Sequence, residues 1–126
     1  MRAVDANVVV RIITRDDPKQ AASADAFVAT GAWVSHVALV EACWVLSTVY
    51  ARNASEMAVA IDRLLEHREL TLQEPDVVAA ALAQFRRTPA IGFADCLLLE
   101  LARKAGRLPL GTFDRDLAKL DGAERL

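Results

Sequence analysis

Short apolar runs alternate with longer segments of helical periodicity along this chain, and this alternation is what most constrains its fold. The apolar runs at 1–4, 32–35, 69–72 and 108–113 predict β-strands, the last of them buried. Between them, apolar residues recur every three or four positions, which is typical of helices that pack one face on a core. Alternating strands and helices predict an α/β fold with a central, mainly parallel β-sheet flanked by helices.

Capping residues and breakers set the expected limits of the helices. The predicted helical ranges are 8–13, 17–31, 35–48, 55–66, 75–87, 93–106 and 114–120. At the first junction, Asn7 is expected to cap the helix that follows. In the third helix, an apolar stripe predicts the buried face: it comprises Val37, Val40, Trp44, Val45 and Thr48. Trp33 and Trp44 are both expected to pack in the core.

Length and composition limit the classes of protein to which the chain can belong. At 126 residues it is expected to form one domain, residues 1–126. A net charge of −2 excludes the strongly basic surface of many nucleic-acid binders. Cys43 and Cys96 are expected to be reduced thiols. Because neither a signal peptide nor a membrane-spanning run is found, we expect a cytoplasmic protein.

Four carboxylates stand where strand and helix patterns would otherwise favour apolar residues. Asp5 and Asp114 directly follow predicted strands, Asp95 lies in the first turn of a predicted helix, and Glu41 falls within the apolar stripe. Taken singly, each acid has a structural explanation: Asp5, Asp95 and Asp114 could cap helices, and Glu41 could be a paired buried charge. These separate explanations do not account for all four acids occurring together.

A shared metal site accounts for the four acids jointly. The carboxyl ends of parallel strands meet at one edge of a sheet, so we expect these side chains to converge there. Two carboxylates about 5 Å apart repel by roughly 3 kcal/mol at an effective dielectric constant of about 20. A divalent cation relieves that repulsion, and Mg²⁺ prefers such oxygen ligands. The chemistry that fits is metal-dependent hydrolysis of a phosphodiester.

Motifs spread over nearly the whole chain resemble the PIN domain family, and in particular its VapC-like toxins. The resemblance is carried by Asp5-Ala-Asn7 with Arg11, Glu41, Gly92-Phe-Ala-Asp-Cys96 with Ala102 and Gly106, and Gly111-Thr-Phe-Asp-Arg-Asp116. It implies a three-layer PIN-like fold. It also implies a toxin ribonuclease of a toxin–antitoxin pair, dependent on Mg²⁺ or Mn²⁺.

The resemblance also implies roles for individual residues and partners. Asp5, Glu41, Asp95 and Asp114 match the catalytic, metal-binding acids, with Asp116 as a further possible ligand. Asn7 and Thr112 match polar positions that orient the acids. Independently of the resemblance, basic residues close in sequence to the expected crevice are candidate RNA contacts: Arg11, Arg15 and Arg115, with Lys19, Arg86 and Arg87 as further ones. The implied partners are an RNA substrate, a cognate antitoxin that inserts near the acids, and a second copy of the chain in a homodimer.

Two other functions are compatible with parts of the pattern. An Asp-nucleophile phosphohydrolase would also place an acid after the first strand, but Asn7 stands where that class has its second acid. A non-catalytic PIN-like binding module would retain the fold as a docking surface. The complete set of acids argues against the second alternative.

Overall fold

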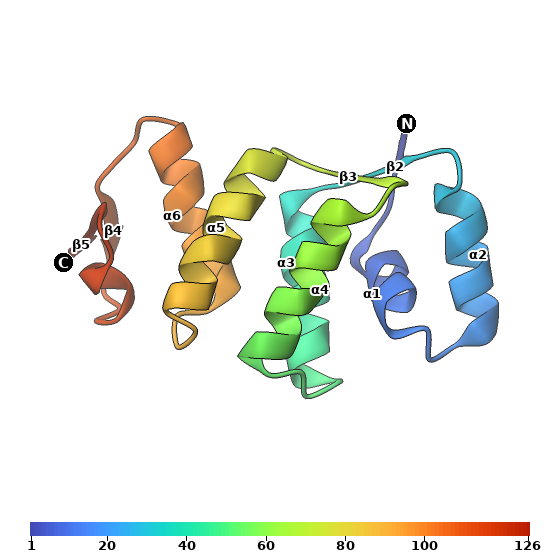
Figure 1. Cartoon of the computed structure of the whole chain (residues 1–126). Helices are drawn as coiled ribbons and strands as arrows, with labels where there is room; N and C mark the ends of the chain where they lie inside the picture. Colours follow the sequence, from blue (N-terminus) through green and yellow to red (C-terminus); the bar gives the residue numbers. More distant parts are fainter. The chain divides into compact units, whose positions relative to one another are not determined.

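The computed structural model describes all 126 residues, and they form two compact units. The first unit comprises Met1–Pro75 and the second Asp76–Leu126. Each unit combines helices with parallel strands (Figure 1). The predicted α/β class is therefore confirmed, and each unit is described in turn.

The first unit contains a three-stranded parallel sheet in the order β1-β2-β3. Its strands are β1 (Arg2–Ala3), β2 (Ala32–Val34) and β3 (Leu70–Leu72). The Val4 amide donates to the Trp33 carbonyl oxygen at 3.1 Å, which continues the pairing of β1 with β2. Because the strands are parallel, Asp5 and Ser35 follow them at the same edge of the sheet. This edge is where the first predicted site residue lies.

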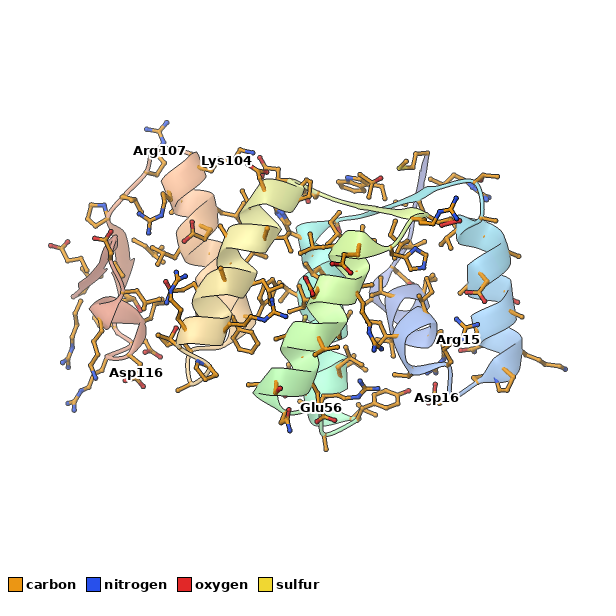
Figure 2. The ribbon with its side chains drawn as sticks, viewed as in Figure 1. Arg15, Asp16, Glu56, Lys104, Arg107 and Asp116 are labelled. Carbon is orange, nitrogen blue, oxygen red and sulfur yellow. The ribbon has the colours of Figure 1, made fainter.

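Four helices complete the first unit, and each begins at a side-chain cap. They are α1 (Ala6–Thr14), α2 (Pro18–Val28), α3 (His36–Thr48) and α4 (Ala54–Glu66), capped by Asp5, Asp17, Ser35 and Asn53. At α4 the cap is reciprocal, since Asn53 accepts from the Glu56 amide and Glu56, labelled in Figure 2, accepts from the Asn53 amide. The predicted helices are confirmed here, but the first cap is Asp5 rather than Asn7.

The buried face of α3 differs from the predicted one. The buried residues are Ala38, Leu39, Ala42, Cys43 and Leu46, whereas Val37 and Trp44 are 69% and 65% exposed. The prediction of a buried Val37–Thr48 stripe was therefore wrong. Nearly every side of this helix carries apolar residues, so periodicity does not select one face. The small side chains of Ala38 and Ala42 lie on the buried side, where α3 packs against α1 and α4.

The second unit contains two helices and a two-stranded parallel sheet. They are α5 (Pro75–Arg87), α6 (Phe93–Lys104), β4 (Leu110–Thr112) and β5 (Ala123–Arg125), with a 3₁₀ helix, η1 (Leu117–Lys119), between the strands. Phe85 and Phe93 make an edge-to-face contact with ring centroids 6.1 Å apart. Lys104, labelled in Figure 2, donates to Asp76 at 2.9 Å. These contacts join α5 to α6.

Three further sequence predictions need correction. The strand β4 is only partly buried, and the helix predicted at 114–120 is the short 3₁₀ helix η1. The strand β5 was not predicted, because its sequence Ala-Glu-Arg has no apolar run. Trp33 points away from the core at 37% exposure, since neighbouring residues of β2 face opposite sides of the sheet.

Two predictions concerning the whole chain can be compared with the structure. Cys43 and Cys96 are buried free thiols, as expected. None of the helices has both the length and the apolar character needed to cross a bilayer.

Candidate active site

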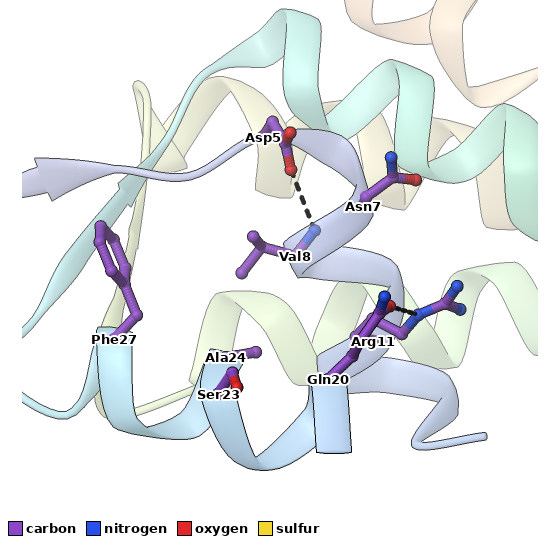
Figure 3. Close-up of a pocket in the computed structure, with 8 residues that line it drawn as sticks. All are labelled: Asp5, Asn7, Val8, Arg11, Gln20, Ser23, Ala24 and Phe27. Carbon is purple, nitrogen blue, oxygen red and sulfur yellow. Dashed lines mark hydrogen bonds between the residues drawn. The ribbon is translucent and has the colours of Figure 1, made fainter. Parts of the chain in front are cut away.

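Asp5 stands where β1 gives way to α1, and its carboxylate is exposed. One oxygen, Oδ1, accepts the Val8 amide at 3.1 Å and so caps the helix (Figure 3). The second oxygen, Oδ2, accepts no hydrogen bond from the protein. The helix-capping role expected for Asp5 is therefore confirmed, and it leaves one carboxylate oxygen available to a ligand. Asn7 is exposed in the first turn of α1 and lines the same surface as Asp5.

Glu41 lies in the second turn of α3, in the same unit as Asp5. The sequence predicted Glu41 on the core side, but it is exposed and lies on the same solvent-facing side of α3 as Val37 and Trp44. The prediction of a buried charge was wrong because α3 turns its small residues inward. An exposed carboxylate needs no protein partner and remains free to bind a cation.

Asp95 and Asp114 are the two predicted acids of the second unit, and the structure brings their charges together. Partial burial in the first turn of α6 raises the pKa of Asp95, and the negative charge of Asp114 raises it further. Both causes disfavour the ionised carboxylate. A positive charge placed beside the two acids would remove the second cause.

The turn after β4 holds Asp114 in a defined position. Asp114 Oδ1 accepts the amides of Asp116 and Leu117 at 2.8 and 2.9 Å. Thr112 Oγ1 accepts the Asp114 amide at 3.0 Å, so Thr112 orients the backbone of this acid. The Asp116 carboxylate lies 3.6 Å from Lys119 Nζ in an exposed ion pair.

The structure pairs two of the candidate RNA-binding arginines with acids of the first unit. Arg15 Nη2 donates to Asp25 at 2.6 Å, and this bond and the charge of Asp25 raise the pKa of Arg15. Arg11 Nη1 lies 3.1 Å from Asp16 Oδ1. Arg115 is exposed on the turn that follows Asp114 and makes no hydrogen bond or ion pair with the protein.

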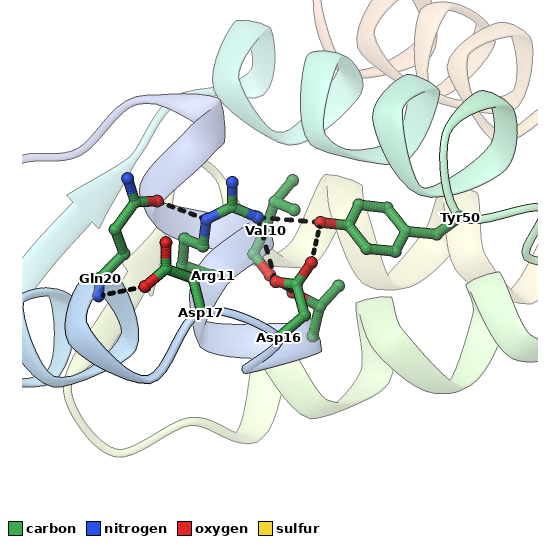
Figure 4. Close-up of polar contacts among 7 residues, drawn as sticks. Val10, Arg11, Asp16, Asp17, Gln20 and Tyr50 are labelled. Carbon is green, nitrogen blue, oxygen red and sulfur yellow. Dashed lines mark hydrogen bonds and ion pairs between the residues drawn. The ribbon is translucent and has the colours of Figure 1, made fainter.

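A polar cluster around Arg11 was missed by the sequence analysis. Arg11 donates through Nη1 to the Tyr50 hydroxyl at 2.8 Å and through Nε to Gln20 Oε1 at 2.5 Å (Figure 4). The Tyr50 hydroxyl in turn donates to Asp16 Oδ2 at 2.6 Å. Tyr50 is the single tyrosine of the chain, but no local pattern links it to Arg11, which is 39 residues away.

Comparison with known families identifies the chain. The model of the PIN domain matches residues 2–123. The chain belongs to the PIN domain family. No curated protein matches the sequence significantly. PIN domains are generally metal-dependent nucleases that act on nucleic acid. This chain therefore has a nuclease fold, and its broad class of activity is that of a hydrolase.

The donor chemistry of this PIN domain suits a divalent cation. Asp5 and Glu41 offer exposed carboxylate oxygens in the first unit, and in the second the charge of Asp114 acts on Asp95. Hard cations such as Mg²⁺ prefer oxygen donors of this kind. In neither unit do three His, Cys, Asp or Glu side chains form a group that could hold a metal. Of the acids predicted from the sequence, Asp5 and Glu41 lie in the first unit, and Asp95 and Asp114 lie in the second.

Proposed function

We propose that this PIN domain is a divalent-metal-dependent endoribonuclease, the toxin of a toxin–antitoxin pair, which hydrolyses RNA phosphodiester bonds. The observation that carries the proposal is that the chain belongs to a family of nucleases, and the charge of Asp114, which raises the pKa of Asp95, supports it. Two carboxylates that repel each other lower the stability of the fold unless a cation neutralises their charge.

Asp5, Glu41, Asp95 and Asp114 are the proposed ligands of Mg²⁺ or Mn²⁺. When bound, such an ion lowers the pKa of a coordinated water and neutralises charge on the phosphodiester. Asp114 is already oriented by its own cap, and Asp5 keeps Oδ2 available while Oδ1 caps α1. Each of these two acids therefore keeps a carboxylate held in place by its own backbone contacts.

Neighbouring polar residues have supporting roles in the proposal. Thr112 holds the backbone of Asp114, and Asn7 lines the same cavity as Asp5. Arg115, which is exposed and unpaired, is the proposed contact to the RNA backbone, because a free guanidinium suits a phosphate. Arg11 and Arg15 are assigned to holding the first unit together, since both pair with acids there.

The proposed partners are an antitoxin and a second copy of the chain. The support is apolar surface: Val37 and Trp44 on α3 are exposed, and so is Phe113, which is 79% exposed immediately before Asp114. Large apolar side chains in solvent are common at interfaces between proteins. An antitoxin arginine near the acids would neutralise them as a metal does. We place the pair in the cytoplasm, where its RNA substrates are.

The test is cleavage by purified protein free of antitoxin. We expect structured tRNA-like and ribosomal RNAs to be cut with Mg²⁺ or Mn²⁺ and left intact with a chelator or with the Asp95→Asn variant. Asp121→Asn, an exposed acid of the same unit, is the matched control and should cut normally. Absence of cleavage by the wild type with either ion would exclude the proposal. A phosphate trapped on Asp5 would instead support a phosphohydrolase that uses an Asp nucleophile.

A further inference from the structure

A cavity of about 380 Å³ opens beside Asp5, between α1 and α2. Val8 and Arg11 line it from α1, and Gln20, Ser23 and Phe27 line it from α2 (Figure 3). Figure 3 shows Phe27 at one end and the paired Arg11 and Gln20 at the other. Its volume lies within the range of small-ligand sites. The metal-binding role proposed for Asp5 does not use the rest of this cavity.

One end of the cavity offers a fixed aromatic surface. The Arg2 guanidinium carbon lies 3.8 Å from the centroid of the Phe27 ring, and Arg2 Nη2 donates to the Phe27 carbonyl oxygen at 3.3 Å. These two contacts hold the half-buried ring in place. Val8 supplies an apolar wall beside it. A flat aromatic group such as a nucleobase can stack or pack against surfaces of this kind.

Toward its other end the cavity offers hydrogen-bond donors, and the one on Gln20 has a fixed orientation. Gln20 Oε1 accepts from Arg11 Nε at 2.5 Å, and since that nitrogen can only donate, the Gln20 amide cannot be reversed. Arg11 is held in turn by Asp16 and Tyr50 (Figure 4). The Gln20 NH₂ group makes no hydrogen bond within the protein, and neither does the Ser23 hydroxyl. Both are available to carbonyl oxygens on the edge of a base.

We propose that this cavity binds one nucleotide of the RNA strand next to the phosphodiester that is cut, with its base between Phe27 and the Gln20 amide. The inference rests on the proposed function, because Asp5 is both a rim residue of the cavity and a proposed metal ligand. Gln20 and Ser23 determine base preference. Gln20 Oε1 already accepts from Arg11, so the cavity offers donors; guanine presents two adjacent acceptors, O6 and N7, to them, whereas adenine has an amino donor beside its N7, so guanine binds better than adenine.

Binding can be measured without cleavage. The metal-free full chain is titrated with 5′-GMP, 5′-UMP and 5′-AMP, and backbone amide shifts are followed by NMR. We expect saturable shifts at Gln20, Ser23 and Phe27, a larger affinity for GMP than for AMP, and little change at Arg52 and Arg63, which line a separate basic cavity between α1 and α4. Shifts confined to Arg52 and Arg63 would mean charge-driven binding elsewhere and would overturn the inference.

The sharpest variant is Gln20→Glu. A carboxylate can still accept from Arg11 Nε, so the polar cluster is retained, but the NH₂ donors are lost. We expect about tenfold weaker GMP binding and loss of its advantage over AMP, with an unchanged melting temperature. Phe27→Ala should weaken the binding of all three nucleotides by a similar factor. Ser55→Ala, an exposed serine outside the cavity, is the control for Ser23→Ala and should bind as wild type.

Cleavage of an RNA library separates this inference from the proposed function. If the wild type cuts RNA and Gln20→Glu and Phe27→Ala both keep its base preference, the subsite is wrong while the ribonuclease proposal stands. If nucleotides bind as expected but no RNA is cut with Mg²⁺ or Mn²⁺, the subsite is supported and the ribonuclease proposal fails. A changed base preference in Gln20→Glu supports both.

Discussion

Asp95, in the first turn of α6, lies close enough to Asp114, after β4, for the charge of Asp114 to raise the pKa of Asp95. Burial is the larger cause, and both act in the same direction. The folded state therefore favours the protonated form of Asp95. This relationship gives the second unit an electrostatic cost that a cation, a proton or a neutral side chain can remove.

Asp95→Asn should abolish activity without destabilising the metal-free protein. A raised folded-state pKa means that stability is lost as pH rises from the ordinary value of 3.8 through that higher pKa. The amide removes this penalty, so at neutral pH the variant should melt at the same temperature as wild type or higher. Cleavage should fall by at least about a thousandfold, the equivalent of several kcal/mol. Thermal melts and initial rates measure the two effects, and normal cleavage would refute the assignment.

Millimolar Mn²⁺ should raise the melting temperature of the wild type. A ligand that binds only the folded state stabilises it by about 2.7 kcal/mol at a hundred times its dissociation constant. The increase should be lost in Asp5→Asn and in Asp114→Asn, which remove one acid from each unit, and kept in Asp121→Asn. Scanning fluorimetry with and without a chelator provides the measurement. A wild-type melting temperature that does not change with Mn²⁺ would contradict the proposed metal site.

Glu41→Gln should reduce activity while leaving the fold intact. Because Glu41 is exposed on α3, its substitution should change the free energy of unfolding by no more than about 0.5 kcal/mol. If Glu41 is a metal ligand, the variant should need more Mn²⁺ for half-maximal cleavage. Glu66→Gln, an exposed glutamate at the end of α4, is the matched control. Identical Mn²⁺ dependence in both variants would remove Glu41 from the site.

Tyr50→Phe should destabilise the first unit in a pH-dependent way. The Tyr50 hydroxyl is the main cause of the lowered pKa of Asp16, ahead of Thr14 and the charge of Arg11. A depressed carboxyl pKa stabilises the fold above its unfolded value, here about 3.8, and this contribution disappears as pH falls through the folded pKa. The stability gap between wild type and variant, from urea titrations, should persist near neutral pH and narrow below pH 3.8. A difference in unfolding free energy that stays constant down to the lowest pH would contradict the proposed link between Tyr50 and Asp16.

Neither thiol should react in the folded protein. Burial raises the pKa of Cys43 to about 12, and burial, followed by the charges of Asp95 and Glu100, raises the pKa of Cys96 to about 11. The thiolate is the reactive form, so a thiol reagent at pH 8 should label neither cysteine. Both should label after addition of denaturant. Rapid labelling of native Cys43 would show that α3 is less well packed than the structure indicates.

The order of the elements from β1 to β4, and most helix starts, could be predicted from the sequence because the interactions that define them are local. Asp17 caps α2 through the amide three residues ahead, and Asn53 and Glu56 cap α4 reciprocally within the same short span. The acids Asp5 and Asp114 could be chosen for the same reason, since each directly follows a strand.

Tertiary structure alone decided which surfaces meet. The apolar α3 could have buried several faces, and packing against α1 and α4 selected the side with Ala38 and Ala42, which leaves Glu41 and Trp44 in solvent. Tyr50 holds Arg11 across 39 residues of sequence, and β5 pairs with β4 without an apolar run of its own. Such contacts depend on shape and on partners distant along the chain, and local periodicity carries no information about either.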